Sequence, residues 1–409
     1  MKKPRILFVA MIESVHTARW LNEVQKLNWD IHIFPSSIWK IHPAIKNVTT
    51  HNIIFRPETA DKSVHCNRSI PFTWHNTSDK INMGLQLARS NFSSPENYEK
   101  YCAEQLVKVI KRVKPDIIHT LEMQHAGYLT VNAKNIMKNA FPPWIYTPWG
   151  NDIYFFSRFP NHVTKIKEVL AACDYYIPKS ERDITLAKEF GFKGEFLTKL
   201  PGNGGLDTGM RTYWQPGKCS ERKIIMVKGY QGPMNRALVA LRAIERCSDI
   251  LKDYSIIVYF AATEDVKAKV TFISQDTGLQ IAILPTISHE EMLKLYGKAR
   301  ISISANISDG VSNSLLESMV MGTFPIESNT SCANEWITHK KTGFLISPED
   351  PEDIIEAIRF AIKNDDLIDQ SAEINFQIAK NTVDKSIISP KIITLYTEIL
   401  EKIKKKPIL

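Results

Sequence analysis

The sequence has 409 residues, of which 44% are hydrophobic, and this length is about twice that of an ordinary single domain. Two domains with separate cores are therefore expected. A formal net charge of +8 favours anionic partners such as nucleoside diphosphates, anionic lipid headgroups and nucleic acids. The sequence has no zinc-finger, basic-zipper or RNA-binding signature, so nucleic acid is the least favoured of the three.

The cysteines and apolar runs indicate a cytoplasmic protein. The six cysteines include no close pair and are expected to be reduced. No apolar run approaches the ~20 residues of a membrane span. The apolar run at residues 6–12 follows basic residues, as in a signal peptide, but Glu13 and His16 end it early, so a first β-strand is predicted there.

The chain opens with a βαβ pattern, namely a strand at 6–10, a helix at 16–27 and a strand at 30–34. This pattern predicts a doubly wound parallel sheet. The first loop lacks the G-x-G-x-x-G pattern of a dinucleotide site, which argues against a nicotinamide enzyme. His16, at the head of the helix, either contacts a substrate at the sheet edge or is a solvated capping residue.

Residues 49–101 show no clear periodicity and are expected to form a functional loop or lid. A basic helix follows, and the C-terminus is also basic. Such a face is either simply solvated or rests on an anionic membrane. The basic residues concerned are Lys100, Lys108, Lys111, Arg112 and Lys114, together with Lys402, Lys404, Lys405 and Lys406.

Two further strands, at 117–119 and 144–147, run into loops, so the side chains at their ends are expected at the carboxyl edge of the sheet. His119, Trp149 and Asp152 are the polar and aromatic residues at these ends. Trp149 belongs to an aromatic cluster, which either packs in the core or stacks on a sugar ring or lipid tail.

The glycine-rich residues 201–209 are expected to form an inter-domain hinge, or a plain linker. The second domain then opens with a strand at 223–227. Lys228 and Arg236 flank the loop between this strand and the next helix. Two cations at such a junction suit a diphosphate, and the alternative is a solvated loop.

Residues 300–322 read as a strand, a tight Ser/Asp/Gly/Asn loop and a helix. The N–H groups of residues 311–314 would face an anion at such a helix start. Asp309 and Glu317 are carboxylates on either side of it. Two structural alternatives remain, a turn-stabilising role for Asp309 and a capping box between Ser314 and Glu317.

This strand, loop and helix resemble the corresponding segment of the retaining glycosyltransferases of family 4, which have the GT-B fold. These enzymes carry two glutamates separated by seven residues, and Asp309 and Glu317 stand at that spacing here. The likeness continues in family order through residues 322–326, 335–337 and 342–346, and earlier through 115–119, 147–152 and 201–209.

The resemblance implies a role for each acid. In the family the first acid lies against the donor sugar and the second binds the ribose hydroxyl groups, and these roles fall here to Asp309 and Glu317. Asp309 is one methylene shorter than the family's glutamate. Trp149 stands where the family often has a histidine that contacts the donor sugar, whereas His119 and Asp152 match.

The resemblance also implies the remaining donor contacts. Lys228 and Arg236 correspond, with exchanged order and longer spacing, to an arginine and a lysine that bind the diphosphate. The loop at 281–287, which includes Thr286, would hold the base through its backbone. The start of the helix after Asp309 would supply the other contacts: Gly310, Val311, Ser312, Asn313 and Ser314.

The architecture implied is α/β and of GT-B type, with two doubly wound, Rossmann-like domains that face a central cleft. The N-terminal, acceptor-side domain is expected at 1–205 and the nucleotide-sugar-binding domain at 206–384. A C-terminal helix, at 385–409, is expected to cross back to the first domain.

The function implied is that of a retaining hexosyltransferase that uses a UDP or GDP sugar as donor. Its acceptor would be a glycan or lipid-linked molecule in surface polysaccharide or glycolipid synthesis. No metal or other cofactor is expected, because the predicted cleft has no D-x-D motif or histidine cluster and protein cations serve instead. The alternatives are a nucleotide-sugar epimerase of the same fold and a non-catalytic nucleotide-sugar-binding partner subunit.

Overall fold

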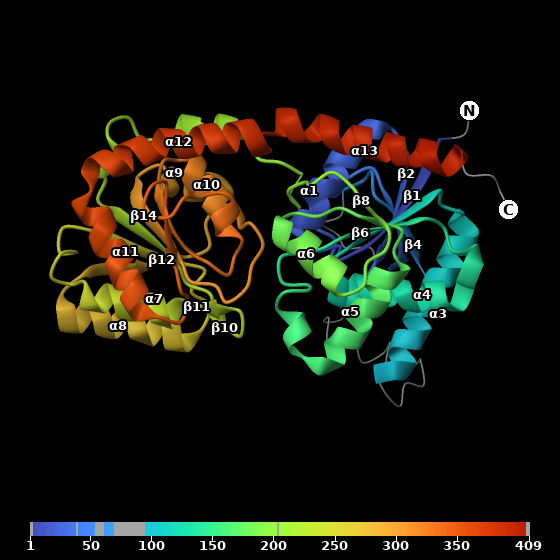
Figure 1. The fold of residues 1–409 in the computed structure, drawn as a ribbon, viewed down its shortest axis with the longest axis horizontal. Helices are drawn as coiled ribbons and strands as arrows, with labels where there is room; N and C mark the ends of the chain where they lie inside the picture. Colours follow the sequence, from blue (N-terminus) through green and yellow to red (C-terminus); the bar gives the residue numbers. More distant parts are fainter. Residues whose placement is uncertain (1–2, 38–39, 54–60, 69–94, 203, 406–409) are drawn as a thin grey trace. The chain divides into compact units, whose positions relative to one another are not determined.

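The computed structural model describes residues 3–37, 40–53, 61–68, 95–202 and 204–405. Contacts divide the chain into two compact units (Figure 1). The first unit comprises residues 1–205 together with 388–409, and the second comprises residues 206–387.

The first unit contains one parallel sheet with the strand order β4-β3-β2-β1-β5-β6-β7-β8. Its strands are β1 (Arg5–Ala10), β2 (Asp30–Pro35), β3 (Thr49–Ile53), β4 (His65–Arg68), β5 (Ile117–Leu121), β6 (Trp144–Thr147), β7 (Tyr175–Tyr176) and β8 (Glu195–Phe196). Its helices are α1 (Val15–Val24), α3 (Pro95–Val113), α4 (Tyr128–Met137), α5 (Pro160–Ala172), α6 (Glu181–Glu189) and most of α13 (Lys385–Lys405).

Helices cover both faces of this sheet because its strands are apolar on both sides. Ile6 and Phe8 of β1 pack with α1 and α13, whereas Leu7 and Val9 pack with α3, α4 and α5. The central strand is fully buried from Ile6 onwards. The predicted βαβ opening is therefore correct.

The expectation of one irregular excursion at residues 49–101 is wrong at its two ends. Strands β3 and β4 extend the sheet there, and helix α3 begins at Pro95. These strands are short and polar, with sequences TTHNI and HCNR, so they lack the apolar signal of a central strand. Residues 54–60 and 69–94 of the predicted lid lie outside the described residues.

The second unit contains a six-stranded parallel sheet with the order β13-β12-β9-β14-β15-β16. Its strands are β9 (Ile224–Lys228), β12 (Ser255–Tyr259), β13 (Gln280–Ile283), β14 (Ala299–Ser304), β15 (Phe324–Ser328) and β16 (Phe344–Ile346), with a separate hairpin of β10 (Gln231–Gly232) and β11 (Asn235–Arg236). Its helices are α7 (Ala237–Arg246), α8 (Glu264–Thr277), α9 (His289–Tyr296), α10 (Asn313–Val320), α11 (Pro351–Lys363) and α12 (Asp365–Val383).

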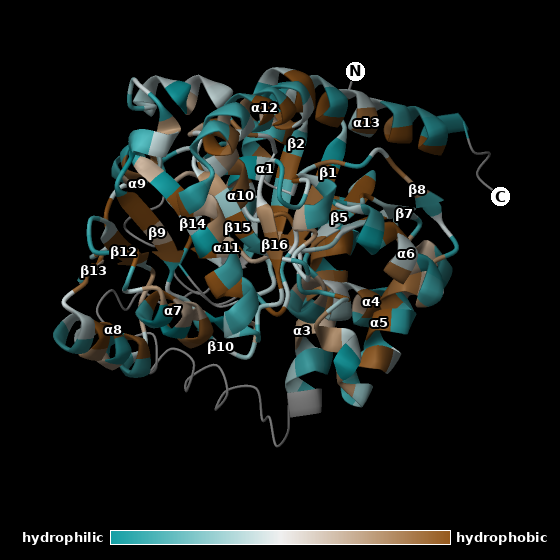
Figure 2. Cartoon of the chain, turned by 60° about the vertical axis from the view of Figure 1, so that its left-hand side comes forward, coloured by the Kyte–Doolittle hydropathy of each residue, from teal (hydrophilic) through white to brown (hydrophobic). Residues whose placement is uncertain are grey.

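This sheet is also covered on both faces. Helices α7, α8 and α11 pack on one face, and α9 and α10 pack on the other. Helix α12 contributes Ile368 and Ala372 to the first cluster and Ala379 and Val383 to the second. Figure 2 shows the hydrophobic strands inside and alternating hydrophilic and hydrophobic residues along helices such as α8 and α13. Within the described ranges, no helix combines the length and the hydropathy needed to span a bilayer. All six cysteines are free thiols, as predicted.

A buried hydrogen-bond network fixes α13 to the first unit's sheet. The Tyr396 oxygen accepts a hydrogen bond from Trp20 Nε1 at 2.8 Å and lies 2.6 Å from Nδ1 of His119. Nε2 of the same histidine lies 2.8 Å from Thr147 Oγ1. Because tryptophan can only donate, the Tyr396 oxygen accepts from Trp20, and each ring nitrogen of His119 has one hydroxyl partner. Burial lowers the pKa of His119 to about 3, so the ring stays neutral.

We expect Tyr396→Phe to lower the free energy of unfolding by about 2–4 kcal/mol, because two buried ring nitrogens lose their partner. Urea unfolding of the full chain measures this loss. Tyr176→Phe is a matched control: Tyr176 is equally buried, but its hydroxyl has no hydrogen-bond partner among the described residues. This control should change stability by less than about 1 kcal/mol. Equal losses in both variants would contradict the role given to the network.

Candidate functional site

Four polar side chains form one row across the second unit's sheet, near the carboxyl ends of its strands. Tyr259 of β12 pairs with Lys228 of β9, and Ser304 of β14 pairs with Glu327 of β15. The preceding residues of β9 and β14 are also paired, so Lys228 lies beside Ser304. Side chains in one row of a parallel sheet point to the same face. We call these four residues the polar row, and it faces α9 and α10, with which Tyr259 packs.

Lys228 meets the first predicted acid at the edge of the sheet. Its Nζ lies 3.5 Å from Oδ2 of Asp309, and the two side chains are 10% and 30% exposed. The other carboxylate oxygen of Asp309 accepts a hydrogen bond from the N–H of Gly310 at 2.8 Å. The pair therefore lies at the carboxyl ends of β9 and β14, at the edge where open α/β sheets bind ligands.

Helix α10 begins directly after this pair, and its N-cap is Ser312. The Ser312 hydroxyl accepts a hydrogen bond from the N–H of Leu315 at 3.1 Å. The predicted capping box of Ser314 and Glu317 is therefore wrong. Ser314 lies within the first turn, where its hydroxyl donates to that of Ser312 at 3.1 Å. Glu317 is consequently not used as a cap.

The segment that enters α10 has the features of an anion site. Gly310 is buried, Val311 is half-buried, and Asn313 is the first helical residue. The N–H groups of a helix's first turn have no partner within the helix, and its dipole is positive at this end. Lys228 adds a full positive charge at the same edge. The predicted anion-binding segment and the predicted cation are thus close to each other.

Glu317 points toward α9 and is 6% exposed. Its Oε1 lies 2.8 Å from Nε2 of His289, the first residue of α9. Thr286 is exposed on the loop between β13 and α9. His289 escaped the sequence analysis because nothing in its own helix indicates a partner, and only the packing of α9 beside α10 produces the contact.

Arg236 reaches the same edge through its backbone. Its N–H donates to the carbonyl oxygen of Ala305, just after β14, at 2.8 Å. Its guanidinium group instead contacts Glu349 at 3.0 Å and donates to the Gly232 carbonyl oxygen at 2.7 Å. The Glu349 side chain is 66% exposed, so this ion pair is exchangeable. The second predicted cation is thus near the edge but turned toward another partner.

Glu327 is an acid that the sequence analysis missed. It is 1% exposed and lies within reach of the Ser304 hydroxyl, and its Oε2 has no hydrogen-bond partner among the described residues. Burial raises the pKa of Glu327 to about 8; the charge of Asp309 also raises it, and Lys228 acts in the opposite direction. An acidic residue within the otherwise mostly apolar strand FPIES could have indicated a buried acid in the sequence.

Two exposed aromatic residues flank the same edge. The rings of Tyr230 and Phe260 stack with centroids 5.1 Å apart and an interplanar angle of 13°. They are 43% and 50% exposed, and Lys228 Nζ lies 5.7 Å from the Tyr230 centroid. Both residues follow the ends of strands, β9 and β12. Neither residue was predicted from the sequence. An aromatic residue within two positions of each strand end could have indicated a binding surface there.

In the first unit, His16 and Trp149 lie together at the carboxyl edge of the sheet. Their rings pack edge-on with centroids 5.6 Å apart, and both residues are half-buried. His16 opens α1 after β1, where its N–H donates to the Ser14 hydroxyl at 3.1 Å. Two of the residues predicted on the substrate side are thus neighbours.

The other two predicted substrate residues, His119 and Asp152, are used inside the first unit. Both ring nitrogens of His119 are occupied in the network that fixes α13. Asp152 accepts hydrogen bonds from the Trp149 N–H at 2.7 Å and the Tyr146 hydroxyl at 2.9 Å. Burial, and then the charge of Glu122, hold the pKa of Asp152 well above its usual range. Their surroundings therefore give them structural roles and do not support the predicted substrate contacts.

Two protein-family models match the sequence, one in each unit. The family "Glycosyl transferases group 1" matches residues 214–377, and "Glycosyl transferase 4-like" matches residues 5–176. No curated protein matches the sequence. Among the described residues, no group of three or more histidine, cysteine, aspartate or glutamate side chains is arranged to hold a metal ion.

Solved structures share the fold at low identity. The sucrose-phosphate synthase (tll1590) of Thermosynechococcus elongatus has a TM-score of 0.70 and 11% identity, over 98% of this chain and 100% of its own. A glycosyltransferase of Rickettsia africae ESF-5 has a TM-score of 0.66 and 16% identity, over 100% of both chains. Anabaena Alr3699/HepE, solved with UDP-glucose, has a TM-score of 0.65 and 13% identity, over 96% of this chain and 99% of its own.

The two doubly wound units and these fold neighbours define a GT-B architecture, so the predicted fold class is confirmed. The two family matches together span most of the chain. The chain belongs to the group 1 glycosyltransferases.

Proposed function

We propose that the chain is a retaining hexosyltransferase that takes its sugar from a nucleoside diphosphate sugar. One observation carries the donor part of this proposal: Lys228 and the start of α10 lie at one sheet edge, and Glu317 follows one turn into the helix. A cation beside a helix N-terminus suits a diphosphate, and a carboxylate suits hydroxyl groups. The complex of the Anabaena protein with UDP-glucose agrees with such a donor.

The chemistry proposed for this edge is stabilisation of the leaving group. The bond between the anomeric carbon and the diphosphate oxygen breaks as the acceptor oxygen bonds to the same face of the sugar. The departing phosphate oxygen takes the acceptor's proton, so retention needs no separate protein base. Lys228 and the first-turn N–H groups of α10 would stabilise the growing negative charge, and one such donor typically contributes about 3 kcal/mol.

The remaining donor contacts follow from the same edge. Asp309 would lie against the sugar and Glu317 against the ribose hydroxyl groups. The Arg236 guanidinium group would exchange its exposed partner Glu349 for the diphosphate, which it can bind in two-pronged fashion. The stacked rings of Tyr230 and Phe260 offer an apolar face beside Lys228 for a sugar or base.

The acceptor is proposed to be a glycan or lipid-linked molecule in surface polysaccharide or glycolipid synthesis. His16 and Trp149, which lie together at the edge of the first unit, supply a hydrogen-bonding group and an aromatic face of the kind that sugars bind. Exposed lysines of α3 and α13, such as Lys108, Lys111 and Lys405, agree with an acceptor held at an anionic membrane.

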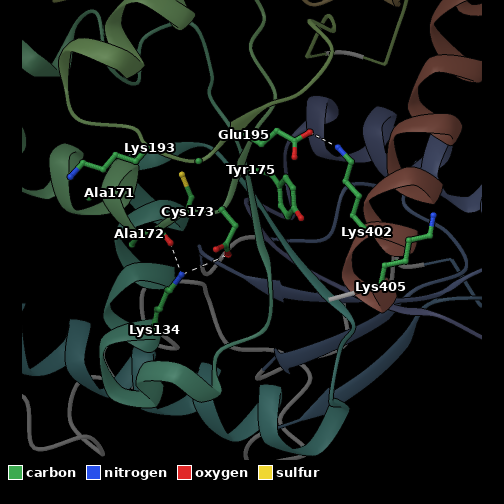
Figure 3. A pocket seen from close by; sticks show the side chains of 11 residues that line it. Lys134, Ala171, Ala172, Cys173, Tyr175, Lys193, Glu195, Lys402 and Lys405 are labelled. Carbon is green, nitrogen blue, oxygen red and sulfur yellow. Dashed lines mark hydrogen bonds and ion pairs between the residues drawn. The ribbon is translucent and has the colours of Figure 1, made fainter. Parts of the chain in front are cut away.

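We also propose that a basic hollow of the first unit contacts the membrane. The hollow has a volume of about 880 Å³ and opens between the α13 end and the β7 and β8 starts (Figure 3). Lys402 pairs with Glu195, whereas Lys193 and Lys405 are exposed. Its lysines are Lys134, Lys193, Lys402 and Lys405. The last C-terminal lysine expected at a membrane, Lys406, lies outside the described residues.

Nucleoside diphosphate binding tests the donor site. We expect UDP, GDP or ADP to raise the thermal midpoint of the full chain, because binding to the folded state stabilises it. Lys228→Ala should weaken the best of these ligands about tenfold to a hundredfold in calorimetry, since a charge-assisted contact is lost. The exposed Lys363 on α11 provides a matched control, Lys363→Ala, which should leave affinity unchanged. If none of the diphosphates binds, the proposed function is wrong. Conversion of a labelled sugar nucleotide to its epimer without acceptor would indicate the epimerase alternative.

A deoxy ligand tests the role of Glu317. If its carboxylate binds ribose, Glu317→Gln should weaken the preferred nucleoside diphosphate by about tenfold or more, a loss typical of a hydrogen bond to a charged group. The same substitution should have little effect on the 2′,3′-dideoxy form of that ligand. Equal weakening of both ligands would show that Glu317 acts through the fold around His289 and not on ribose.

Vesicle binding tests the basic hollow. We expect the full chain to sediment with vesicles containing phosphatidylserine and not with neutral vesicles, and to be released by salt. The double variant Lys193→Glu, Lys405→Glu should lose about tenfold or more in affinity, because each lysine near an anionic surface contributes about 1 kcal/mol. Lys298→Glu with Lys363→Glu makes the same charge change on exposed positions of the second unit. If both double variants lose binding equally, the contact is a general charge effect and the hollow is not its site.

A further inference from the structure

A buried acid lies directly beneath the proposed diphosphate site. Glu327 stands in the polar row two strands away from Lys228, and Ser304 lies on the strand between them. Parallel pairing turns all three side chains to the same face of the sheet. Asp309 lies on the outer side of Lys228, at 3.5 Å. The ammonium group thus has one acid toward the solvent and another toward the interior.

The hydrogen bonds of Glu327 are incomplete. The Ser304 hydroxyl forms a hydrogen bond with the Glu327 carboxyl group. The same hydroxyl accepts a hydrogen bond from Asn306 Nδ2 at 2.9 Å. Oε2 has no hydrogen-bond partner among the described residues, although Glu327 is 1% exposed. A buried carboxylate with a bare oxygen is costly unless a cation approaches it, whereas a neutral carboxylic acid tolerates the same place.

The charged and titratable groups that interact with Glu327 come from β9, β12, α9 and the loop after β14. Lys228 ends β9, and Asp309 lies in the loop after β14. The hydroxyl groups of Tyr259 on β12 and Tyr296 on α9 also interact electrostatically with Glu327. The Tyr296 hydroxyl donates a hydrogen bond to that of Tyr259 at 2.9 Å. Burial raises the pKa of both tyrosines, so they stay neutral. Lys228 is therefore the cation to which an ionised Glu327 would turn.

We propose that Glu327 is a positioning residue for donor binding. As a neutral acid it leaves the Lys228 ammonium group to the diphosphate, and as a carboxylate it draws this group inward, away from the ligand. This inference rests on the proposed function. Diphosphate binding then favours the protonated acid, and affinity should fall as the pH rises through the pKa of Glu327, which burial raises to about 8.

Calorimetry of the full chain with UDP, GDP or ADP, whichever binds best, tests this coupling between about pH 7 and pH 9. The wild type should lose about threefold to tenfold in affinity over this range, because the neutral fraction of Glu327 falls by about tenfold. Glu327→Gln keeps the neutral shape, so it should match the wild type near pH 7 and remain tight near pH 9. Glu356→Gln, on the exposed side of α11, should keep the wild-type decline.

A second measurement covers the case in which Glu327→Gln does not fold. Near pH 8 the wild type should take up about half a proton per diphosphate bound, read from calorimetry in two buffers of different ionisation enthalpy. Zero uptake, or net release, overturns the inference. The inference is also overturned if the affinity of Glu327→Gln falls with pH as that of the wild type does. A loss of affinity in Glu327→Gln that is the same at every pH overturns it as well. Failure of all three diphosphates to bind the wild type would instead overturn the proposed function itself.

Discussion

The register of the parallel strands in the second unit is the constraint on which the site depends. In-register pairing puts Lys228, Ser304 and Glu327 in one row. The side chains of one row of a parallel sheet all point to the same face. A slip of one residue in β9 would turn Lys228 into the apolar cluster that holds Val227 and Ile303. The burial of Val227 and its neighbours therefore fixes the face of the sheet to which Lys228 points. In this way the core positions the site.

The polar row is costly to fold. Its members lie against the apolar cluster between the sheet, α9 and α10, where an incompletely bonded acid opposes stability. Functional sites often keep such groups because a ligand later satisfies them. The first unit shows the contrasting solution at its own sheet edge: His119 and Tyr396 satisfy each other, and the ring remains neutral and inaccessible. Polar residues near strand ends are thus incompletely hydrogen-bonded in the second unit and satisfied by one another in the first.

The sequence predicted the features that depend on local pattern. The alternation of strands and helices, the loop before α10 and the cation at the end of β9 all follow from periodicity and turn residues. Features that depend on distant neighbours were missed. Ser312 and Ser314 are both acceptable caps, and only the position at which the helix starts decides between them. The contact of Glu317 with His289 requires two helices to pack side by side, which no local pattern encodes.

The chain departs from the family pattern at two positions, Asp309 and Trp149, and the surroundings of the two residues differ. Asp309 is shorter than the usual glutamate, and its Oδ2 lies 3.5 Å from Nζ of Lys228. Trp149 replaces a histidine, but its backbone N–H still binds Asp152, and its ring is supported by His16. At this position the side chain is therefore a half-buried indole where the resemblance implies an imidazole. An aromatic face contributes affinity for a sugar ring through contact area, and its selectivity depends less on individual hydroxyl groups.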